Sequence, residues 1–372
     1  MDRIVVGMSG GVDSSVAALL LKEQGYDVVG VFMKNWPEWD EGGECTASQD
    51  WRDMQHVCGV LSIPFYGVNF EKEYQDRVFS QFLKEYEQGR TPNPDVLCNR
   101  EIKFKAFLDF AMKLGAVRMA TGHFARCCDI EEHTVLLKGI DPDKDQSYFL
   151  YMLKENQLAK ALFPVGGITK AQVRELARKA GLPVSQKRDS TGICFIGERN
   201  FRHFLQGFLP PQPGEIQTQE GRKVGNHLGL AYYTLGQRRG LGIGGIGGGD
   251  GRRWFVVEKD LERNVLVVAQ GENCSRLYNR YVRASQPTWI SGLAPAHEGE
   301  PFRCTAKFRY RQADQPVWAM QKEQMLYLRA DELQRAVTPG QSAVLYQGDI
   351  CLGGATIEEA GMEPMGKLVW EF

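Results

Sequence analysis

The chain has 372 residues, enough for two or three domains, and no apolar run approaches the length needed to cross a bilayer. Hydrophobic residues make up 43% of it and charged residues 24%, which excludes wholesale disorder and fibrous repeats. The net charge of −1 excludes a global field that recruits nucleic acid, although residues 199–253 hold eight basic and three acidic residues, which indicates a polyanionic partner or a solvated face.

The first third of the chain alternates strand-like and helix-like patterns. Apolar runs predict strands at 4–6, 28–33, 63–70 and 117–121, and apolar residues at helical spacing predict helices at 12–25, 71–89 and 99–115. Such alternation is typical of a parallel sheet with helices on both faces. A further helix is expected at 170–181, and short apolar runs between turn residues predict a small barrel or sandwich over 281–372.

These patterns predict an α/β fold with three domains, at 1–200, at 201–280 for a basic central domain, and at 281–372 for a C-terminal β-barrel domain. The chain runs from Met1 directly into its first apolar stretch without the features of an export signal, so we expect a cytoplasmic protein that needs no membrane. Its nine cysteines include no C-x-x-C pair, which excludes zinc-ribbon patterns, and we expect no metal held by protein ligands alone.

A glycine- and serine-rich turn joins the first predicted strand to the first predicted helix. Its sequence is Gly7-Met8-Ser9-Gly10-Gly11-Val12-Asp13-Ser14-Ser15. Backbone N–H groups and the positive end of the helix dipole point at one place in such a turn, which predicts an anion site. A Walker A loop would need a lysine, and a dinucleotide loop would need glycine in place of Ser9. The alternative to an anion site is a tight turn without a ligand.

Two cysteines lie in segments that favour a chemical role. Cys98 follows the run 92–97, whose two prolines exclude helix, so we expect a helix to start near Asn99 and its dipole to stabilise the Cys98 thiolate. Asp95 is close enough in sequence to handle a proton. Cys194 lies between glycines at 192 and 197, which predicts a mobile segment. Taken singly, a cysteine is more often a cap or a core residue.

Together these motifs carry a family resemblance. The run Ser-Gly-Gly-Val-Asp-Ser-Ser at 9–15, after an N-terminal strand, resembles the pyrophosphate loop of the ATP pyrophosphatases, which cleave ATP between the α and β phosphates. With Asn-Pro-Asp-x-x-Cys-Asn at 93–99 and Gly-Ile-Cys-Phe-Ile-Gly at 192–197, the whole chain resembles the tRNA-specific 2-thiouridylases. Supporting runs lie at 120–126, 144–150 and 308–312. The resemblance implies a parallel-sheet ATP pyrophosphatase (adenine nucleotide alpha hydrolase-like) catalytic domain at 1–200.

The same resemblance implies a reaction. ATP adenylates the C2 oxygen of the wobble uridine of a tRNA, and a persulfide on Cys194 then supplies sulfur, with Cys98 as the second catalytic thiol and Asp95 as acid or base. The products are 2-thiouridine, AMP and pyrophosphate, and a Cys98–Cys194 disulfide remains to be reduced. Mg²⁺ is expected with ATP, because Asp13 in an anion loop needs a cation to offset it. A sulfur-relay protein or a cysteine desulfurase is the implied donor.

The resemblance also implies contact residues. Those for ATP are Gly7, Met8, Ser9, Gly10, Gly11, Val12, Asp13, Ser14, Met33 and Gly122. Those for tRNA are Asn93, Pro94, Asp95, His123, Lys144, Asp145, Gln146, Arg309, Tyr310 and Gln341. Direct persulfide attack or released sulfide, and an iron–sulfur cluster on Asp95, Cys98 and Cys194, stay open. Two other functions also stay open: an amidating or ligating enzyme of the nucleotide or argininosuccinate synthetase type, and a non-catalytic RNA-binding protein with ATP as a structural ligand.

Overall fold

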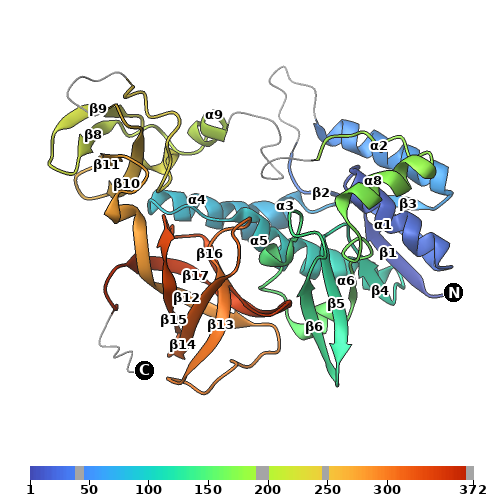
Figure 1. Ribbon diagram of the computed structural model, residues 1–372. Helices are drawn as coiled ribbons and strands as arrows, with labels where there is room; N and C mark the ends of the chain where they lie inside the picture. Colours follow the sequence, from blue (N-terminus) through green and yellow to red (C-terminus); the bar gives the residue numbers. More distant parts are fainter. Residues whose placement is uncertain (38–45, 190–200, 245–250, 366–372) are drawn as a thin grey trace.

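The structure is a computed structural model, and it describes residues 1–37, 46–189, 201–244 and 251–365. An α/β unit comes first in the chain, a small β unit follows, and a β-barrel comes last (Figure 1). This arrangement confirms the predicted fold class. No helix among the described residues is long and apolar enough to cross a membrane.

Five parallel strands form the first sheet, in the order β3-β2-β1-β4-β7. The strands are β1 (Arg3–Gly7), β2 (Asp27–Lys34), β3 (Phe65–Asn69), β4 (Arg118–Ala120) and β7 (Ala161–Leu162). Side chains alternate between the faces, so Val5 packs into one core while Ile4 and Val6 pack into the other. The strand order reverses between β1 and β4, and open α/β sheets bind ligands outside the carboxyl ends of the strands at such a point.

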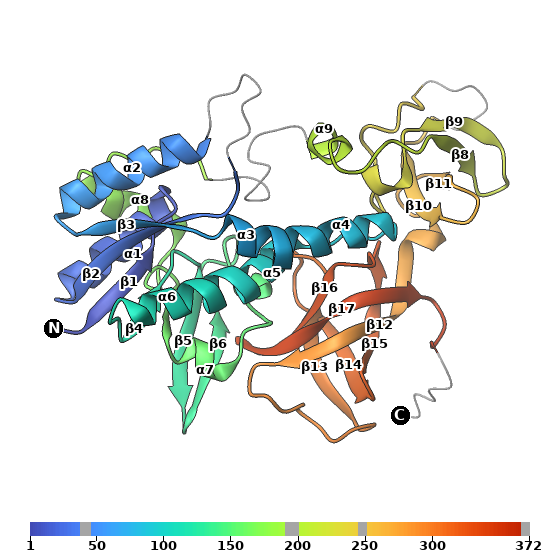
Figure 2. The same cartoon turned by 180° about the vertical axis from the view of Figure 1, so that it is seen from behind.

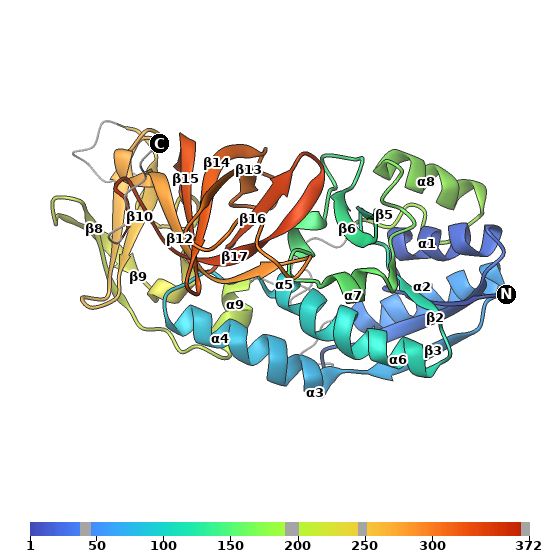
Figure 3. The same cartoon turned by 90° about the horizontal axis from the view of Figure 1, so that it is seen from below.

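Helices cover both faces of this sheet (Figure 3). One face carries α1 (Val12–Glu23), α2 (Thr46–Leu61) and α8 (Lys170–Lys179). The other face carries two continuous helical runs. The first run is α3 (Glu71–Tyr74), η1 (Gln75–Phe79) and α4 (Ser80–Glu87), and the second is α5 (Pro94–Cys98), η2 (Asn99–Phe107) and α6 (Leu108–Lys113). The α2 helix was not predicted from the sequence. Its buried residues Met54, Val57, Cys58 and Leu61 nevertheless have helical spacing, so the pattern was present in the sequence.

The helix that carries Cys98 starts earlier than predicted. It begins at Pro94 and not near Asn99, because Pro94 occupies the first helical position, where a missing N–H costs nothing. The expectation that the prolines exclude helix before Cys98 is therefore wrong. Cys98 lies at the end of the first helical turn and not ahead of it.

The last six strands of the chain form a closed barrel and not a sandwich. Its six strands pair in the order β12-β15-β14-β13-β16-β17, and β12 pairs with β17 to close it. They are β12 (Tyr278–Trp289), β13 (Pro301–Lys307), β14 (Gln315–Lys322), β15 (Met325–Arg335), β16 (Ser342–Gln347) and β17 (Ile350–Gly361). A hairpin from the first half of the chain, β5 (Ala125–Ile130) and β6 (His133–Lys138), extends this sheet, since Leu136 pairs with Cys351.

The small β unit has four strands in the order β10-β11-β8-β9. They are β8 (Gly214–Thr218), β9 (Lys223–His227), β10 (Trp254–Asp260) and β11 (Val265–Gln270), and the remaining short elements are η3 (Ser147–Phe149), α7 (Glu155–Leu158), α9 (Phe201–Gln206), η4 (Leu230–Tyr232) and η5 (Ser275–Leu277). The run from α3 to α4 extends from the first sheet toward this unit and the barrel (Figures 1 and 2). Lys259 caps its end by donating to the Gly89 carbonyl at 2.9 Å.

Candidate active site

The phosphate loop, residues 7–15, lies between β1 and α1. Gly10 has a φ of +73°, and a Cβ there would lie 2.3 Å from the Asp50 backbone oxygen, so only glycine fits. The Ser14 hydroxyl accepts from the Ser9 N–H at 3.2 Å and donates to the Gly11 carbonyl at 3.2 Å, which fixes the turn. The cap residue of α1 is Gly11, which has no side chain to accept from the first N–H groups of the helix. These N–H groups can therefore bind an anion.

A lysine from a distant helix binds the carboxylate of the phosphate loop. Lys170 Nζ lies 2.6 and 2.8 Å from the two Asp13 oxygens and 2.8 Å from Asp189. Asp189 also accepts from Lys144 at 2.7 Å and from Arg174 at 2.8 Å. Burial raises the pKa of Asp13, although Lys170 opposes the rise; at Asp189, hydrogen bonds from Lys144 and Lys170 outweigh burial and lower the pKa to about 2. The cation that offsets Asp13 in this structure is therefore a lysine.

A second lysine holds the phosphate loop from the side of α2. Lys187 Nζ donates to the Gly10 carbonyl at 3.1 Å and to Asp50 at 2.6 Å, and it also pairs with Asp53. These contacts tie the glycine turn to the start of α2. Two lysines thus contact the phosphate loop from two directions, and each of them is paired with two carboxylates.

The contacts of Lys170, Arg174 and Lys187 were not predicted from the sequence. Lys170 and Arg174 are four residues apart and so share one face of a predicted helix, a signal that was available. The sequence does not say which surface that face meets, because the contact joins segments more than 150 residues apart. Lys187 gave no signal of its own.

The two remaining residues predicted to contact ATP lie beside the phosphate loop. A Cβ on Gly122, just after β4, would lie 2.5 Å from the Ser14 backbone nitrogen, so the chain after β4 packs directly on the start of α1. A Cβ on Gly7 would lie 3.2 Å from the Met33 methyl group. The structure therefore brings residues from the ends of β1, β2 and β4 together at the reversal of strand order.

The segment predicted to hold the target base forms the start of a helix. The Asn93 side chain caps it by accepting the Asp95 N–H at 3.2 Å. Asp95 is half-buried, and burial raises the pKa of its carboxyl although the charge of Lys103 opposes the rise. Cys98, one turn later, is 1% exposed. Cys194 lies outside the described residues.

Four residues predicted to contact tRNA form local hydrogen bonds and ion pairs next to this site. His123 is buried, and its Nδ1 lies 2.7 Å from the Thr121 hydroxyl. The Gln146 side chain accepts the Phe124 N–H at 2.9 Å. Buried Asp145 accepts the Gly139 and Ser147 N–H groups, each at 3.1 Å. Lys144 pairs with Asp189 as described above, so all four help to shape the loops around β4.

Three more residues predicted to contact tRNA come from the barrel side. The Tyr310 ring lies 4.3 Å from the Phe149 ring, which places it beside the 144–149 segment. Gln341 Nε2 donates to the Thr91 carbonyl at 2.7 Å, just ahead of the target-base segment. The Arg309 guanidinium donates to the Ala336 carbonyl, and burial lowers its pKa. The barrel thus contacts both segments of the α/β unit that were predicted to meet tRNA.

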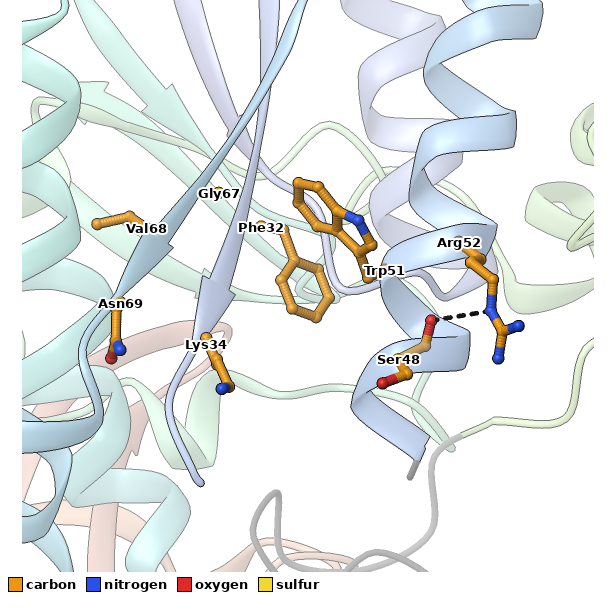
Figure 4. Close-up of a pocket in the computed structure, with 8 residues that line it drawn as sticks. All are labelled: Phe32, Lys34, Ser48, Trp51, Arg52, Gly67, Val68 and Asn69. Atoms are coloured by element: carbon orange, nitrogen blue, oxygen red, sulfur yellow. Dashed lines mark hydrogen bonds between the residues drawn. The ribbon is translucent and has the colours of Figure 1, made fainter. Parts of the chain in front are cut away.

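A pocket of about 460 Å³ opens beside the carboxyl ends of β2 and β3 (Figure 4). Its lining residues are Phe32, Lys34, Ser48, Trp51, Arg52, Gly67, Val68 and Asn69. The Trp51 ring meets Phe32 edge to face at 5.5 Å, and Gly67 makes room for it, since a Cβ there would lie 3.2 Å from the indole. No residue predicted to bind ATP or tRNA lines this pocket, so it lies beside the predicted site.

The fold and the loop geometry define the class of protein. A parallel sheet whose order reverses at a glycine–serine phosphate loop is an ATP-pyrophosphatase-type α/β domain, here followed by a small β unit and a closed barrel. Three family models match the chain: the tRNA methyl transferase HUP domain over residues 2–198, the tRNA methyl transferase PRC-barrel domain over 202–270, and the aminomethyltransferase beta-barrel domain over 279–357.

Curated relatives give the particular family. The tRNA-specific 2-thiouridylases MnmA of Exiguobacterium sibiricum, Halalkalibacterium halodurans and Bacillus cytotoxicus are 57%, 56% and 56% identical to this chain, over 96% of it and 94%, 94% and 95% of the relative. The chain belongs to the tRNA-specific 2-thiouridylase family, which confirms the resemblance seen in its motifs. A solved 4-thiouridine synthetase–RNA complex with bound ATP is 18% identical, covers 55% of this chain and 49% of that chain, and has a TM-score of 0.34, too low to support a conclusion.

Proposed function

We propose that this chain uses ATP to replace the C2 oxygen of the wobble uridine of a tRNA by sulfur. One observation carries the proposal: the helix that begins with the target-base segment packs against the phosphate loop at the carboxyl end of β1. A Cβ on Gly7 would lie 3.2 Å from the ring of Phe107, which is on that helix. Family membership favours this function over a ligase, which would need neither cysteine, and over a non-catalytic RNA-binding protein.

ATP would bind with its phosphates on the phosphate loop and the start of α1. Lys170 and Lys187 would stabilise the pyrophosphate, and Met33 and Gly122 would border the adenosine. Mg²⁺ would enter with the nucleotide as an Mg·ATP complex. Among the described residues no three His, Cys, Asp or Glu side chains cluster to hold a metal. Asp13 and Lys170, which are paired in this structure, would meet that complex together, and the metal would supply charge neutralisation for the leaving pyrophosphate.

The uridine is a poor acceptor until its oxygen is activated. Its C2 oxygen attacks the α-phosphorus, pyrophosphate leaves with the bonding electrons, and the N3 proton is lost. Asp95 would lie beside the base, and because burial raises the pKa of its carboxyl, this group is suited to exchange a proton in the step. The wobble base must leave its stack to reach Asp95, which costs a few kcal/mol.

Sulfur transfer would complete the reaction. A Cys194 persulfide, loaded by a sulfur-relay protein or a cysteine desulfurase, attacks C2, and AMP leaves with the C2 oxygen. The Cys98 thiolate then attacks the Cys194 sulfur, which frees the thiocarbonyl and forms a disulfide that an external reductant reopens. In the sulfide route, Cys98 attacks the persulfide first and the released sulfide attacks C2.

The tRNA would lie across the α/β unit and the barrel. Asn93 and Pro94 would border the base, and the segment 144–146 with Arg309, Tyr310 and Gln341 would contact the anticodon region. The domain bounds 1–200, 201–280 and 281–372 stay a prediction of the sequence, and β12, which begins at Tyr278, would move the start of the barrel domain three residues earlier. Cytoplasmic residence stays a prediction of the sequence.

The test is the product itself. Purified protein is incubated with unmodified tRNA, Mg·ATP and either sulfide or a loaded cysteine desulfurase, and nucleosides are analysed by mass. We expect 2-thiouridine from wild type and from Cys128→Ser, which changes an exposed cysteine of β5 that is not among the predicted site residues, and none from Cys98→Ser with the desulfurase. Absence of 2-thiouridine from wild type under both conditions would overturn the proposal.

A further inference from the structure

Lys103 lies on the helix that carries the target-base segment, two turns after Asp95. This part of the helix, Asn99–Phe107, has π geometry, and its backbone departs from helical angles at Phe104, with φ −100° and ψ 16°. π segments inside helices are rare and are frequent at functional sites, because the wider turn changes the direction of a side chain. The residue next to this departure is Lys103.

Lys103 lies between the two halves of the proposed site. Four residues further along the same helix, Phe107 packs against Gly7 of the phosphate loop. In the other direction, the positive charge of Lys103 is close enough to Asp95 to oppose the effect of burial on that carboxyl. Residues four apart share a helix face, so Lys103 lies on the face through which Phe107 meets the phosphate loop.

His123 orients the lysine. Lys103 Nζ lies 3.4 Å from His123 Nε2, while His123 Nδ1 lies 2.7 Å from the Thr121 hydroxyl. Burial, with a smaller contribution from Lys103, holds the pKa of His123 well below its ordinary value, so the ring is neutral. The contacts assign its tautomer: Nε2 accepts from the ammonium and Nδ1–H donates to Thr121. Both ring nitrogens are thus engaged within the protein.

This arrangement connects Lys103 to the nucleotide side of the site. His123 directly follows Gly122, which packs on the backbone of Ser14 at the start of α1. The Lys103 ammonium therefore contacts His123, and the neighbouring residue Gly122 packs on the phosphate loop. A lysine side chain brings a compact charge that can bind a phosphoryl oxygen without a fixed orientation.

We propose that Lys103 is a catalytic residue of the adenylation step, in which its ammonium binds the α-phosphoryl group as the uracil oxygen attacks. The inference rests on the proposed function and adds a residue to it. In this step a bond forms between the uracil C2 oxygen and Pα, the bond from Pα to the bridging oxygen breaks, and pyrophosphate carries away the electron pair. The N3 proton goes to a base. A preorganised cation stabilises the charge that moves across Pα more than it stabilises bound ATP.

The test compares two lysines of one helix. Lys103→Met removes the ammonium and keeps an apolar stem, and Lys105→Met is the matched control, because Lys105 is exposed and pairs with Glu101 at 2.9 Å. The assay measures tRNA-dependent formation of AMP and pyrophosphate at saturating ATP and tRNA. Separate measurements give the KM for ATP, the Kd for tRNA and the unfolding midpoint.

We expect Lys103→Met to lower kcat for adenylation by about 10²–10³-fold, as loss of one transition-state donor does elsewhere, with little change in the ATP KM or the tRNA Kd. Lys103→Arg should recover part of the rate, and Lys105→Met should match wild type. Adenylation by Lys103→Met within about threefold of wild type, or a loss confined to KM or Kd, overturns the inference. If the methionine variant does not fold, Lys103→Gln and Lys103→Arg decide by the same criteria. Failure of wild type to make 2-thiouridine would instead overturn the proposed function.

Discussion

Gly122→Ala tests how closely the end of β4 must approach the phosphate loop. The added Cβ would lie 2.5 Å from the Ser14 nitrogen, 2.7 Å from the Asp13 carbonyl carbon and 3.0 Å from the Ser14 Cα, all backbone atoms. Ordinary contact begins at 3.4 Å, so the two segments must separate by about 0.9 Å. Overpacking of this kind costs about 1–3 kcal/mol of stability. A displacement near 1 Å at a catalytic site costs about 100-fold in rate.

The assay is tRNA-dependent AMP formation, with urea unfolding as the measure of stability. Gly167→Ala is the control, because a Cβ there meets no heavy atom within 4 Å and its φ is not in the left-handed region. We expect Gly122→Ala to lose far more activity than its small loss of stability explains, and Gly167→Ala to lose neither. Unchanged AMP formation by Gly122→Ala would refute the prediction that the reaction needs this close approach of the two segments.

Three further predictions concern charged residues. Lys170→Met should weaken ATP binding by about 2 kcal/mol in calorimetry, because it removes a charge-assisted contact and exposes phosphate to a carboxylate; Lys179→Met, on an exposed turn of the same helix, should bind ATP normally. The pKa of Asp189 is about 2 against an ordinary 3.8, so its charge stabilises the fold above pH 3.8, and this contribution is lost as the pH falls toward 2. Asp189→Asn should remove that part of the acid-unfolding profile, and an unaltered profile would contradict this prediction. Lys307→Met should lower the free energy of unfolding by about 3 kcal/mol, since it removes a cationic partner of the Asp145 side chain, which is only 3% exposed. Adding Asp145→Asn should restore part of this loss in urea unfolding.

The local elements of the α/β unit could be predicted because their signals are short-range. The β1 strand, the glycine turn and α1 were predicted together, since the apolar run, the glycines after it and the helical spacing after Gly11 are signals between neighbouring residues. The start of the Cys98 helix was wrong by five residues, because Pro94 is equally compatible with a loop and with a first helical position. The Asn93 cap, formed in the folded chain, decides between them.

By itself, the sequence determined the fold class, the phosphate loop and the motifs that identify the family, because each depends on residue types at fixed spacing. Only the tertiary structure decided which cations reach the loop: Lys170 and Lys187 contact it across more than 150 residues, and no spacing rule reports such a distance. The pairing of β6 with β17, which joins the α/β unit to the barrel, was likewise decided by folding. A strand edge or an ammonium group can pair with many partners, and the packing of the whole chain selects one of them.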